Sequence, residues 1–261
     1  MKTKLFCFFV LSVMFGAATA AELFGTVDAL EGAAVLSGEN GTQSAISVGT
    51  LIYAGQSITT AADGEVHIVT TDSGLIALRP NSNFRVERYQ AKGEDSDEIS
   101  FSLFKGALRS ITGWIAKRNP AAYQLKTTNA TIGIRGTDHE TFIIETENGA
   151  ELPGTYNTVY EGSTVVQSEH GNAEVRTGES AYAARNADQA PKLLEHRPEF
   201  MQRRALRIEQ RIQKRKETLR TEIHKRVQTR KDARNEKPDA GERRERAAQR
   251  QHELRMQHRQ Q

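Results

Sequence analysis

Apolar residues recur at every second position along much of residues 24–184, which is the period of a half-buried β-strand. The alternation is clear at 64–69 and 83–89, with sequences GEVHIV and NFRVERY. Short groups of Gly, Asn, Asp, Ser and Pro interrupt these runs, as turns do, at 38–41, 63–64, 72–74, 80–82 and 147–149. The pattern predicts an all-β body of many short strands.

Two segments of this body are similar to each other. Residues 31–41 and 161–171 both begin with Glu-Gly, share a valine and a second glutamate, and end on a glycine. A further glycine follows each of them, at Gly49 and Gly178. Stacked strand-turn-strand repeats would give a solenoid-like module. The alternative is a β-sandwich in which two glycine-cornered hairpins resemble each other by chance.

The periodicity changes after Pro191, where the chain becomes rich in Arg, Lys, Gln and Glu. Apolar residues there recur at steps of three, four or seven: Met201, Ala205, Ile208, Ile212, Leu219, Ile223 and Val227. This predicts a basic amphipathic helix over residues 191–234 with one narrow apolar stripe. Such a stripe needs a cover, which is a second copy in a coiled coil, the β body or another protein. Residues 235–261 have few large apolar side chains and are expected to form a basic, disordered or frayed end.

Charge divides the chain at the same place. Residues 21–190 carry 12 Lys and Arg against 22 Asp and Glu, a net charge of −10, whereas residues 191–261 carry 22 against 11, a net charge of +11. The overall charge of +3 hides this division. An acidic body therefore precedes a basic tail, and the two attract each other.

The first 20 residues have the order of a secretory signal peptide. Lys2 and Lys4 precede the apolar run 5–15, and Ala18-Thr19-Ala20 follows it. We therefore expect a protein that is periplasmic or secreted, with a signal of Gram-negative type. The single cysteine, Cys7, would leave with the peptide, which excludes disulfides, thiolate metal sites and a cysteine nucleophile. No later stretch is apolar enough to cross a membrane.

The densest group of catalytic residue types is Asp138-His139-Glu140. In a strand, Asp138 and Glu140 share one face and His139 takes the other, so we expect a surface strand rather than a metal site. The body contains no His-Glu-x-x-His, Gly-x-Ser-x-Gly, phosphate-loop or dinucleotide pattern. We therefore predict no metal, no cofactor and no enzymatic activity. The alternative is an enzyme that acts on envelope polysaccharide through distant carboxylates on a β-solenoid.

The most specific segment is LKTTNATIGIRGT at residues 125–137. Gly133 and Gly136 suit a tight corner between strands because glycine accepts positive φ and close backbone approach. Arg135 offers five donors that could satisfy carbonyls at such a corner or bind a nearby carboxylate. We expect a structural role for it rather than a ligand contact.

This segment resembles the signature of the FecR domain, named for the ferric-citrate regulator, in which a Thr-Pro-x-Ala strand enters a Gly-hydrophobic-Arg-Gly-Thr turn. Thr128 stands where the family usually has proline. The resemblance covers roughly residues 24–184. It implies that the following positions are family signature residues with structural roles: Gly106, Gly113, Thr127, Ala130, Gly133, Arg135, Gly136 and Thr137.

The resemblance implies an exported module that binds or displays, without catalysis. Transmembrane regulators of the family carry a sigma-factor-binding segment and a membrane span before the domain, whereas this chain offers a signal peptide. The resemblance therefore does not imply that the chain binds a sigma factor. We expect a binding, scaffolding or signal-sensing module of the cell envelope whose partner is an envelope protein or glycan. The basic tail would associate with an anionic lipid surface or with itself, and export removes nucleic acid as a partner. The alternative is an adaptor whose tail is the binding element.

Overall fold

The computed structural model describes residues 21–94, 96–119, 122–147, 151–185, 188–202, 206–235 and 249. The predicted signal peptide at 1–20 and nearly all of the predicted frayed end lie outside these residues. In the described part, no helix is both long enough and apolar enough to cross a membrane.

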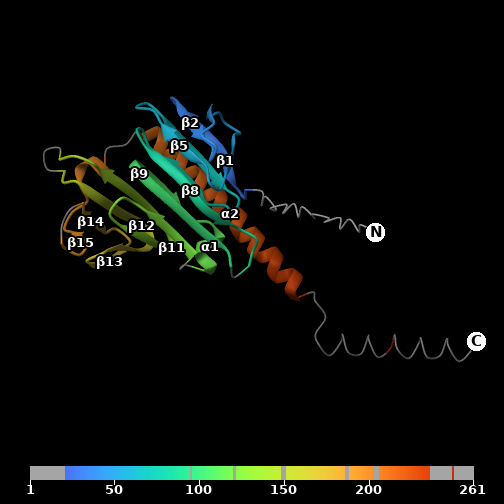
Figure 1. Ribbon diagram of the computed structural model, residues 1–261. Helices are drawn as coiled ribbons and strands as arrows, with labels where there is room; N and C mark the ends of the chain where they lie inside the picture. Colours follow the sequence, from blue (N-terminus) through green and yellow to red (C-terminus); the bar gives the residue numbers. More distant parts are fainter. Residues whose placement is uncertain are drawn as a thin grey trace, which may run out of the picture.

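Most of the described chain is β-structure, so the prediction of a mainly β fold is confirmed. The strands belong to one open sheet whose main order is β15-β14-β12-β11-β10-β9-β7-β6-β1-β4. Their bounds are β1 Leu23–Glu31, β2 Ala34–Ser37, β3 Gln43–Ala45, β4 Leu51–Tyr53, β5 Ser57–Thr60, β6 Glu65–Thr70, β7 Leu75–Leu78, β8 Asn83–Gln90, β9 Glu98–Ile111, β10 Tyr123–Lys126, β11 Thr131–Ile144, β12 Gly154–Ser168, β13 Gly171–Arg176, β14 Ser180–Ala184 and β15 Lys192–Leu194. The short helix α1 is Trp114–Arg118, and the long helix α2 is Leu206–Asn235 (Figure 1).

Three long strands, β9, β11 and β12, change neighbours halfway along their length. For example, β11 pairs with β10 through Thr131–Gly133 and with β9 from Asp138 onward. Each of the three strands has a glycine with positive φ near the change: Gly106 at +82°, Gly136 at +64° and Gly162 at +80°. A Cβ on Gly162 would lie 2.4 Å from the carbonyl oxygen of Gly136. The strands therefore bend together at positions that require glycine.

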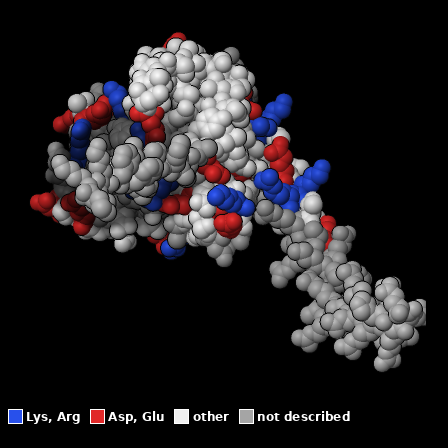
Figure 2. All heavy atoms as spheres, turned by 45° about the vertical axis from the view of Figure 1, so that its right-hand side comes forward, with Lys and Arg blue, Asp and Glu red and all other residues white. Residues whose placement is uncertain are grey.

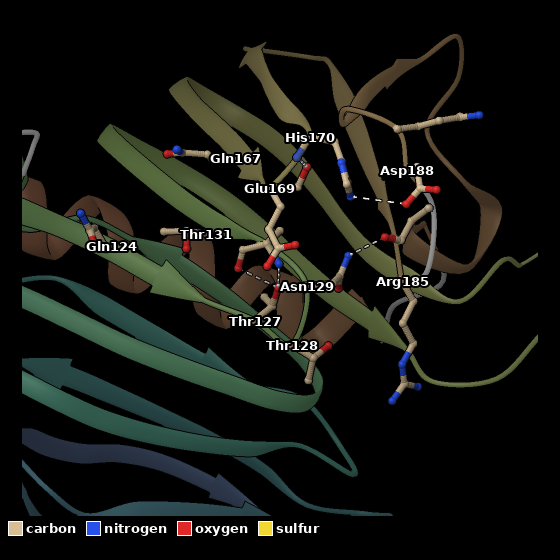
Figure 3. Close-up of a pocket in the computed structure, with 14 residues that line it drawn as sticks. Gln124, Thr127, Thr128, Asn129, Thr131, Gln167, Glu169, His170, Arg185 and Asp188 are labelled. Atoms are coloured by element: carbon tan, nitrogen blue, oxygen red, sulfur yellow. Dashed lines mark hydrogen bonds and ion pairs between the residues drawn. The ribbon is translucent and has the colours of Figure 1, made fainter.

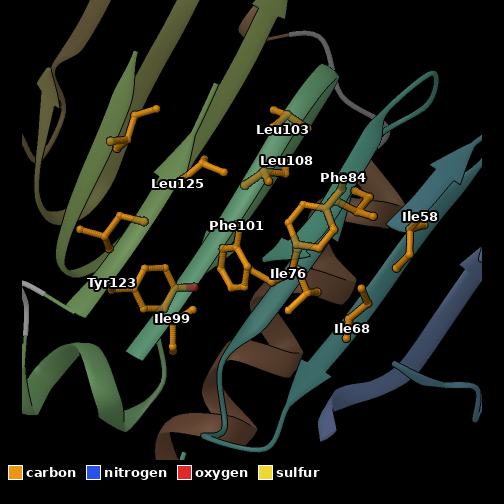
Figure 4. Close-up of a cluster of buried hydrophobic side chains, with 14 of the residues drawn as sticks. Ile58, Ile68, Ile76, Phe84, Ile99, Phe101, Leu103, Leu108, Tyr123 and Leu125 are labelled. Carbon is orange, nitrogen blue, oxygen red and sulfur yellow. The ribbon is translucent and has the colours of Figure 1, made fainter. Parts of the chain in front are cut away.

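The bent sheet encloses an aromatic and aliphatic core (Figure 4). Phe101 is 1% exposed, and its ring centroid lies 5.3 Å from those of both Phe24 and Phe84. Tyr123 from β10 packs edge-on against it at 5.5 Å. Edge-to-face and tilted ring pairs of this kind add to the stabilisation from burial. The ring of Phe101 thus serves packing, whereas Phe104 is 47% exposed.

The self-similar segments occupy equivalent hairpins. Residues 31–41 lead through β2 into β3, and residues 161–171 lead through β12 into β13. Gly49 and Gly178 have φ of +89° and +88°, and each donates its N–H to a valine carbonyl at 2.8 Å, of Val27 and Val159 respectively. The repeat therefore has a structural counterpart, while solenoid-like stacking stays a prediction.

The C-terminal region differs from the prediction of one helix starting at 191. Residues 192–194 form β15, which extends the sheet beside β14, and a 3-10 turn follows at Glu199–Met201. The helix α2 begins only at Leu206 and runs along one face of the sheet (Figure 1). Ile212 and Leu219 are at most 1% exposed and pack in a cluster with Leu75, Ala77 and Ile111. The chain's own β body thus covers the apolar stripe at Ile208, Ile212 and Leu219, whereas Val227 at its end is 43% exposed.

The two glycines of the motif should differ in what they tolerate. Gly136→Val should lower the free energy of unfolding by about 1–3 kcal/mol, because a β-branched residue is strained at φ +64°. Gly133→Val is the matched control, since an added Cβ there has only one neighbour, the Val165 carbonyl oxygen at 3.9 Å. We expect a change within about 0.5 kcal/mol for this variant in urea unfolding. Equal losses for the two would contradict the bend at Gly136.

Candidate functional site

A polar pocket of about 830 Å³ opens beside the motif at residues 125–137 (Figure 3). It lies between the β10–β11 turn, the β12–β13 turn and the segment that follows β14. Its lining consists of Gln124, Thr127, Thr128, Asn129, Ala130, Thr131, Gln167, Ser168, Glu169, His170, Ala184, Arg185, Asp188 and Gln189. Three separate parts of the sequence therefore meet there, with the motif on one side.

The wall formed by the motif is fixed by hydrogen bonds. The Thr127 hydroxyl donates to the Ala130 carbonyl at 3.0 Å and so closes the β10–β11 turn. The Asn129 side-chain amide donates to the carbonyls of Ala183 and Ala184, at 2.9 and 3.1 Å, at the end of β14. Side-chain bonds to the backbone of this kind hold a turn in one conformation. The pocket therefore has a preformed wall.

Other polar side chains of the pocket are available to a ligand. Thr131 of β11 lies opposite Gln167 of β12, and Gln124 of β10 lies opposite Gly133 of β11. Gln124, Thr131 and Gln167 make no side-chain hydrogen bond within the described chain, and Gly133 adds no side chain to the surface beside them. The lining includes no Phe, Tyr or Trp ring on which a sugar could stack. The pocket can thus offer hydrogen bonds, which suits a peptide.

A second polar group lies between the sheet and α2. Arg109 of β9, 1% exposed, donates two hydrogen bonds to the Asp138 carboxylate of β11, at 2.7 and 2.8 Å. The helix adds Lys216, whose Nζ lies 2.5 Å from Asp138 and 3.0 Å from Glu161, and Glu209, which contacts Arg109. Burial alone would raise the pKa of Asp138, but the hydrogen bonds and charges of Arg109 and Lys216 hold it below its usual range.

The same face carries a second buried carboxylate. Arg79, which directly follows β7, donates to Glu140 at 2.9 and 3.0 Å, and it also binds Glu65 of β6 at 3.0 Å. The Tyr160 hydroxyl donates to Glu140 at 2.9 Å, and the guanidinium of Arg109 lies 4.3 Å from the Tyr160 ring centre. Each buried charge is thus compensated, as burial requires.

The expectation of a surface strand at 138–140 is wrong, because the exposed fractions of Asp138, His139 and Glu140 are 1%, 0% and 0%. The alternation is as expected, since the two acids face α2 and its preceding segment while His139 points into the sheet interior. There the Asn157 amide donates to the Nδ1 of His139 at 3.1 Å, and burial lowers the pKa of His139 to about 4. The three side chains therefore diverge. In the described residues, no three His, Cys, Asp or Glu side chains are arranged to hold a metal ion.

The structural role of Arg135 stays a prediction. Its side chain is exposed and makes no hydrogen bond or ion pair within the described chain. The buried arginine is Arg109, which sequence reasoning missed. A signal for it existed, because Arg109 alternates with Ala107 and Ile111 on one face of β9. Residues 107–111 are buried on both faces, and an arginine in such a place requires a carboxylate partner.

The remaining signature residues lie at close approaches of the backbone or in the core. A Cβ on Gly113 would lie 2.1 Å from the carbonyl oxygen of Asp72, and one on Gly106 would lie 2.4 Å from the Ser82 hydroxyl. Ala130 is 7% exposed. The carbonyl of Thr137 accepts the Thr112 N–H at 2.9 Å.

Removal of the Asp138 carboxylate should be strongly destabilising. Asp138→Asn leaves Arg109 and Lys216 without their shared anion, and we expect a loss of about 3–5 kcal/mol in the free energy of unfolding. The control is Lys214→Met on the exposed side of α2, which should change stability by no more than about 0.5 kcal/mol. Because the folded pKa of Asp138 lies below 3.8, its contribution is present above about pH 4 and is lost on further acidification. A mild effect at neutral pH would contradict a buried, paired carboxylate.

His139 should make stability depend on pH in a different range. Its pKa falls from 6.5 in the unfolded chain to about 4 in the folded one, so the unfolded state binds more protons between these values. The stability should therefore be full above pH 6.5 and should fall by roughly 3 kcal/mol on acidification to pH 4. His139→Gln should flatten this slope in urea unfolding at several pH values, and the exposed His170→Gln should keep it. An unchanged slope in His139→Gln would show that another group titrates.

Comparison with known proteins agrees with the motif. Residues 56–164, which include the bends at Gly106, Gly136 and Gly162, match the family model described as FecR protein. The chain matches no curated protein. Two crystal structures of a candidate anti-sigma factor from Parabacteroides distasonis ATCC 8503 are similar to it, with TM-scores of 0.42 and 0.41, 10% identity, and coverage of 54% of this chain and 59% of that chain. The chain thus spans less than two thirds of those proteins, and a similarity at this level carries no argument about function. Residues 56–164 of the chain thus match the FecR family, as the resemblance of the motif predicts.

Proposed function

We propose that this protein is an exported, non-catalytic sensing module of the cell envelope that binds an extended segment of a partner protein in the polar pocket. The observation that carries the proposal is the position of the pocket beside the FecR-like motif, with Gln124, Thr131 and Gln167 open to a ligand. Unpaired donors and acceptors on neighbouring strands match the regular spacing of groups on a peptide backbone.

The buried titratable groups support a role without catalysis. Asp138 and Glu140 are each bound by arginine, and His139 lies on the opposite side of the strand. A general acid or base has to reach a substrate with a proton to give or take. These groups are instead closed off by α2 and the core, so they serve the fold.

The absence of Phe, Tyr and Trp from the pocket lining favours a protein over a glycan. Saccharide sites in proteins commonly use a flat apolar ring face against the sugar, and the 14 lining residues supply none. Export is supported by the order of charged, apolar and small residues at positions 2–20. An exported protein would meet its partner in the cell envelope.

Site-specific photocrosslinking in the native host tests this proposal. A photoreactive amino acid at Thr131 should give one discrete crosslinked envelope protein, and the same group at the exposed Lys192 should not. Adding Gly133→Leu should reduce the Thr131 crosslink several-fold without lowering the melting temperature, because the new side chain projects over the open surface. Mass spectrometry of the same sample should show a chain starting at residue 21.

Three results would overturn the proposal. An intact Met1 would remove the envelope location. Identical crosslinks from Thr131 and Lys192, or a Thr131 crosslink that Gly133→Leu leaves unchanged, would remove the pocket as the binding site.

A further inference from the structure

The helix α2 has two parts with different electrostatic surroundings. In the first part, basic side chains are matched to carboxylates of the body: Arg211 to Glu31 at 2.9 Å, Arg215 to Asp28 at 3.1 Å, and Lys216 to Glu161 at 3.0 Å. Together with the buried Ile212 and Leu219, these pairs fix this part to the sheet. The charges of Arg211, Arg215 and Lys216 are thus already paired within the chain.

The second part, residues 224–235, lies beyond the body. Among the α2 side chains that the structure describes, Ile223 is the last buried one, at 7% exposed, and the helix then extends past the sheet (Figure 1). This part contains five basic residues and one acid, Asp232, which accepts a hydrogen bond from Gln228 at 3.0 Å. Within the described chain, no carboxylate lies within 4 Å of Lys225 or Arg226. Figure 2 shows Lys and Arg side chains on the helix where it leaves the body.

The spacing of these charges is unfavourable for an isolated helix. Arg226, Arg230 and Arg234 follow one another at intervals of four residues, which places them in one row. Like charges at this spacing repel and destabilise a helix. Lys231 and Val227 lie next to the row, so that four cations and one apolar residue fall within roughly 140° of the helix circumference. Val227 is 43% exposed.

We propose that residues 224–235 of α2 bind an anionic phospholipid surface. A row of cations around an exposed apolar residue suits a plane of phosphate headgroups, because all cations of one face meet anions at once while the apolar residue enters the boundary layer. The body carboxylates Glu31, Asp28 and Glu161 are paired with the first part of the helix, and no described carboxylate lies within 4 Å of Lys225 or Arg226. The proposal goes beyond the pocket and does not depend on its ligand.

Vesicle sedimentation tests the proposal with the full chain from residue 21, so that the apolar run 5–15 does not itself insert. Vesicles of phosphatidylcholine with 30% phosphatidylglycerol should bind the protein at 0.1 M salt, and pure phosphatidylcholine should not. Reversal of the row by Arg226→Glu, Arg230→Glu and Arg234→Glu should weaken binding by at least about a hundredfold. At 1 M salt, where the screening length is only about 3 Å, binding should be lost.

The matched control carries the same change of charge on the body, with Lys92→Glu, Lys126→Glu and Lys192→Glu, all at exposed positions. It should bind nearly as well as the parent, and circular dichroism should show that both triple variants keep the helix. A chain that ends at residue 235 should also bind. Equal weakening in both triple variants, retained binding in the row variant, or loss of binding in the shortened chain would overturn the proposal. Tighter binding to double-stranded DNA than to the anionic vesicles would assign the surface to nucleic acid instead.

Discussion

The pairing of Arg109 with Asp138 is the constraint on which the rest of the structure depends. Both side chains are 1% exposed, and they join β9 to β11 next to the bend at Gly136. A buried pair of charges is stable only if its geometry and its remaining hydrogen bonds are satisfied. Here α2 completes the arrangement with Lys216 and Glu209. The helix is therefore part of the folded body. Without it, Arg109 and Asp138 would face water on one side and would lose their ion pairs with Glu209 and Lys216.

Ion pairs also hold the basic helix α2 against the acidic β body. The attraction between a net −10 and a net +11 is resolved into individual contacts along the first half of α2. Apolar contacts of Ile212 and Leu219 with Leu75, Ala77 and Ile111 set the position of the helix. Charge thus selects the face, and packing fixes the helix on it.

Much of the fold could be predicted from local patterns, because strand periodicity, glycine turns and the amphipathic stripe are properties of neighbouring residues. The bend at Gly136 was predictable on this basis, as was a helix with its apolar stripe. The burial of Asp138 and Glu140 was not, since it depends on Arg109 and Arg79, which lie 29 and 61 residues away. The strand β15 was missed because its pairing with β14 overrides a charged, helix-like composition. The pocket was missed for a similar reason, as three turns distant in sequence form it.

The two ends of the sheet carry a consequence for solubility. The terminal strands, β4 and β15, have only three residues each, and β15 begins with a lysine. Unpaired strand edges are templates for a second chain, and natural proteins limit this hazard by short edges and by lysine. An open sheet of this size would otherwise present two long rows of free N–H and C=O groups. The brevity of β4 and β15 leaves an incoming strand few backbone partners at these two ends of the sheet, which limits edge-to-edge aggregation there.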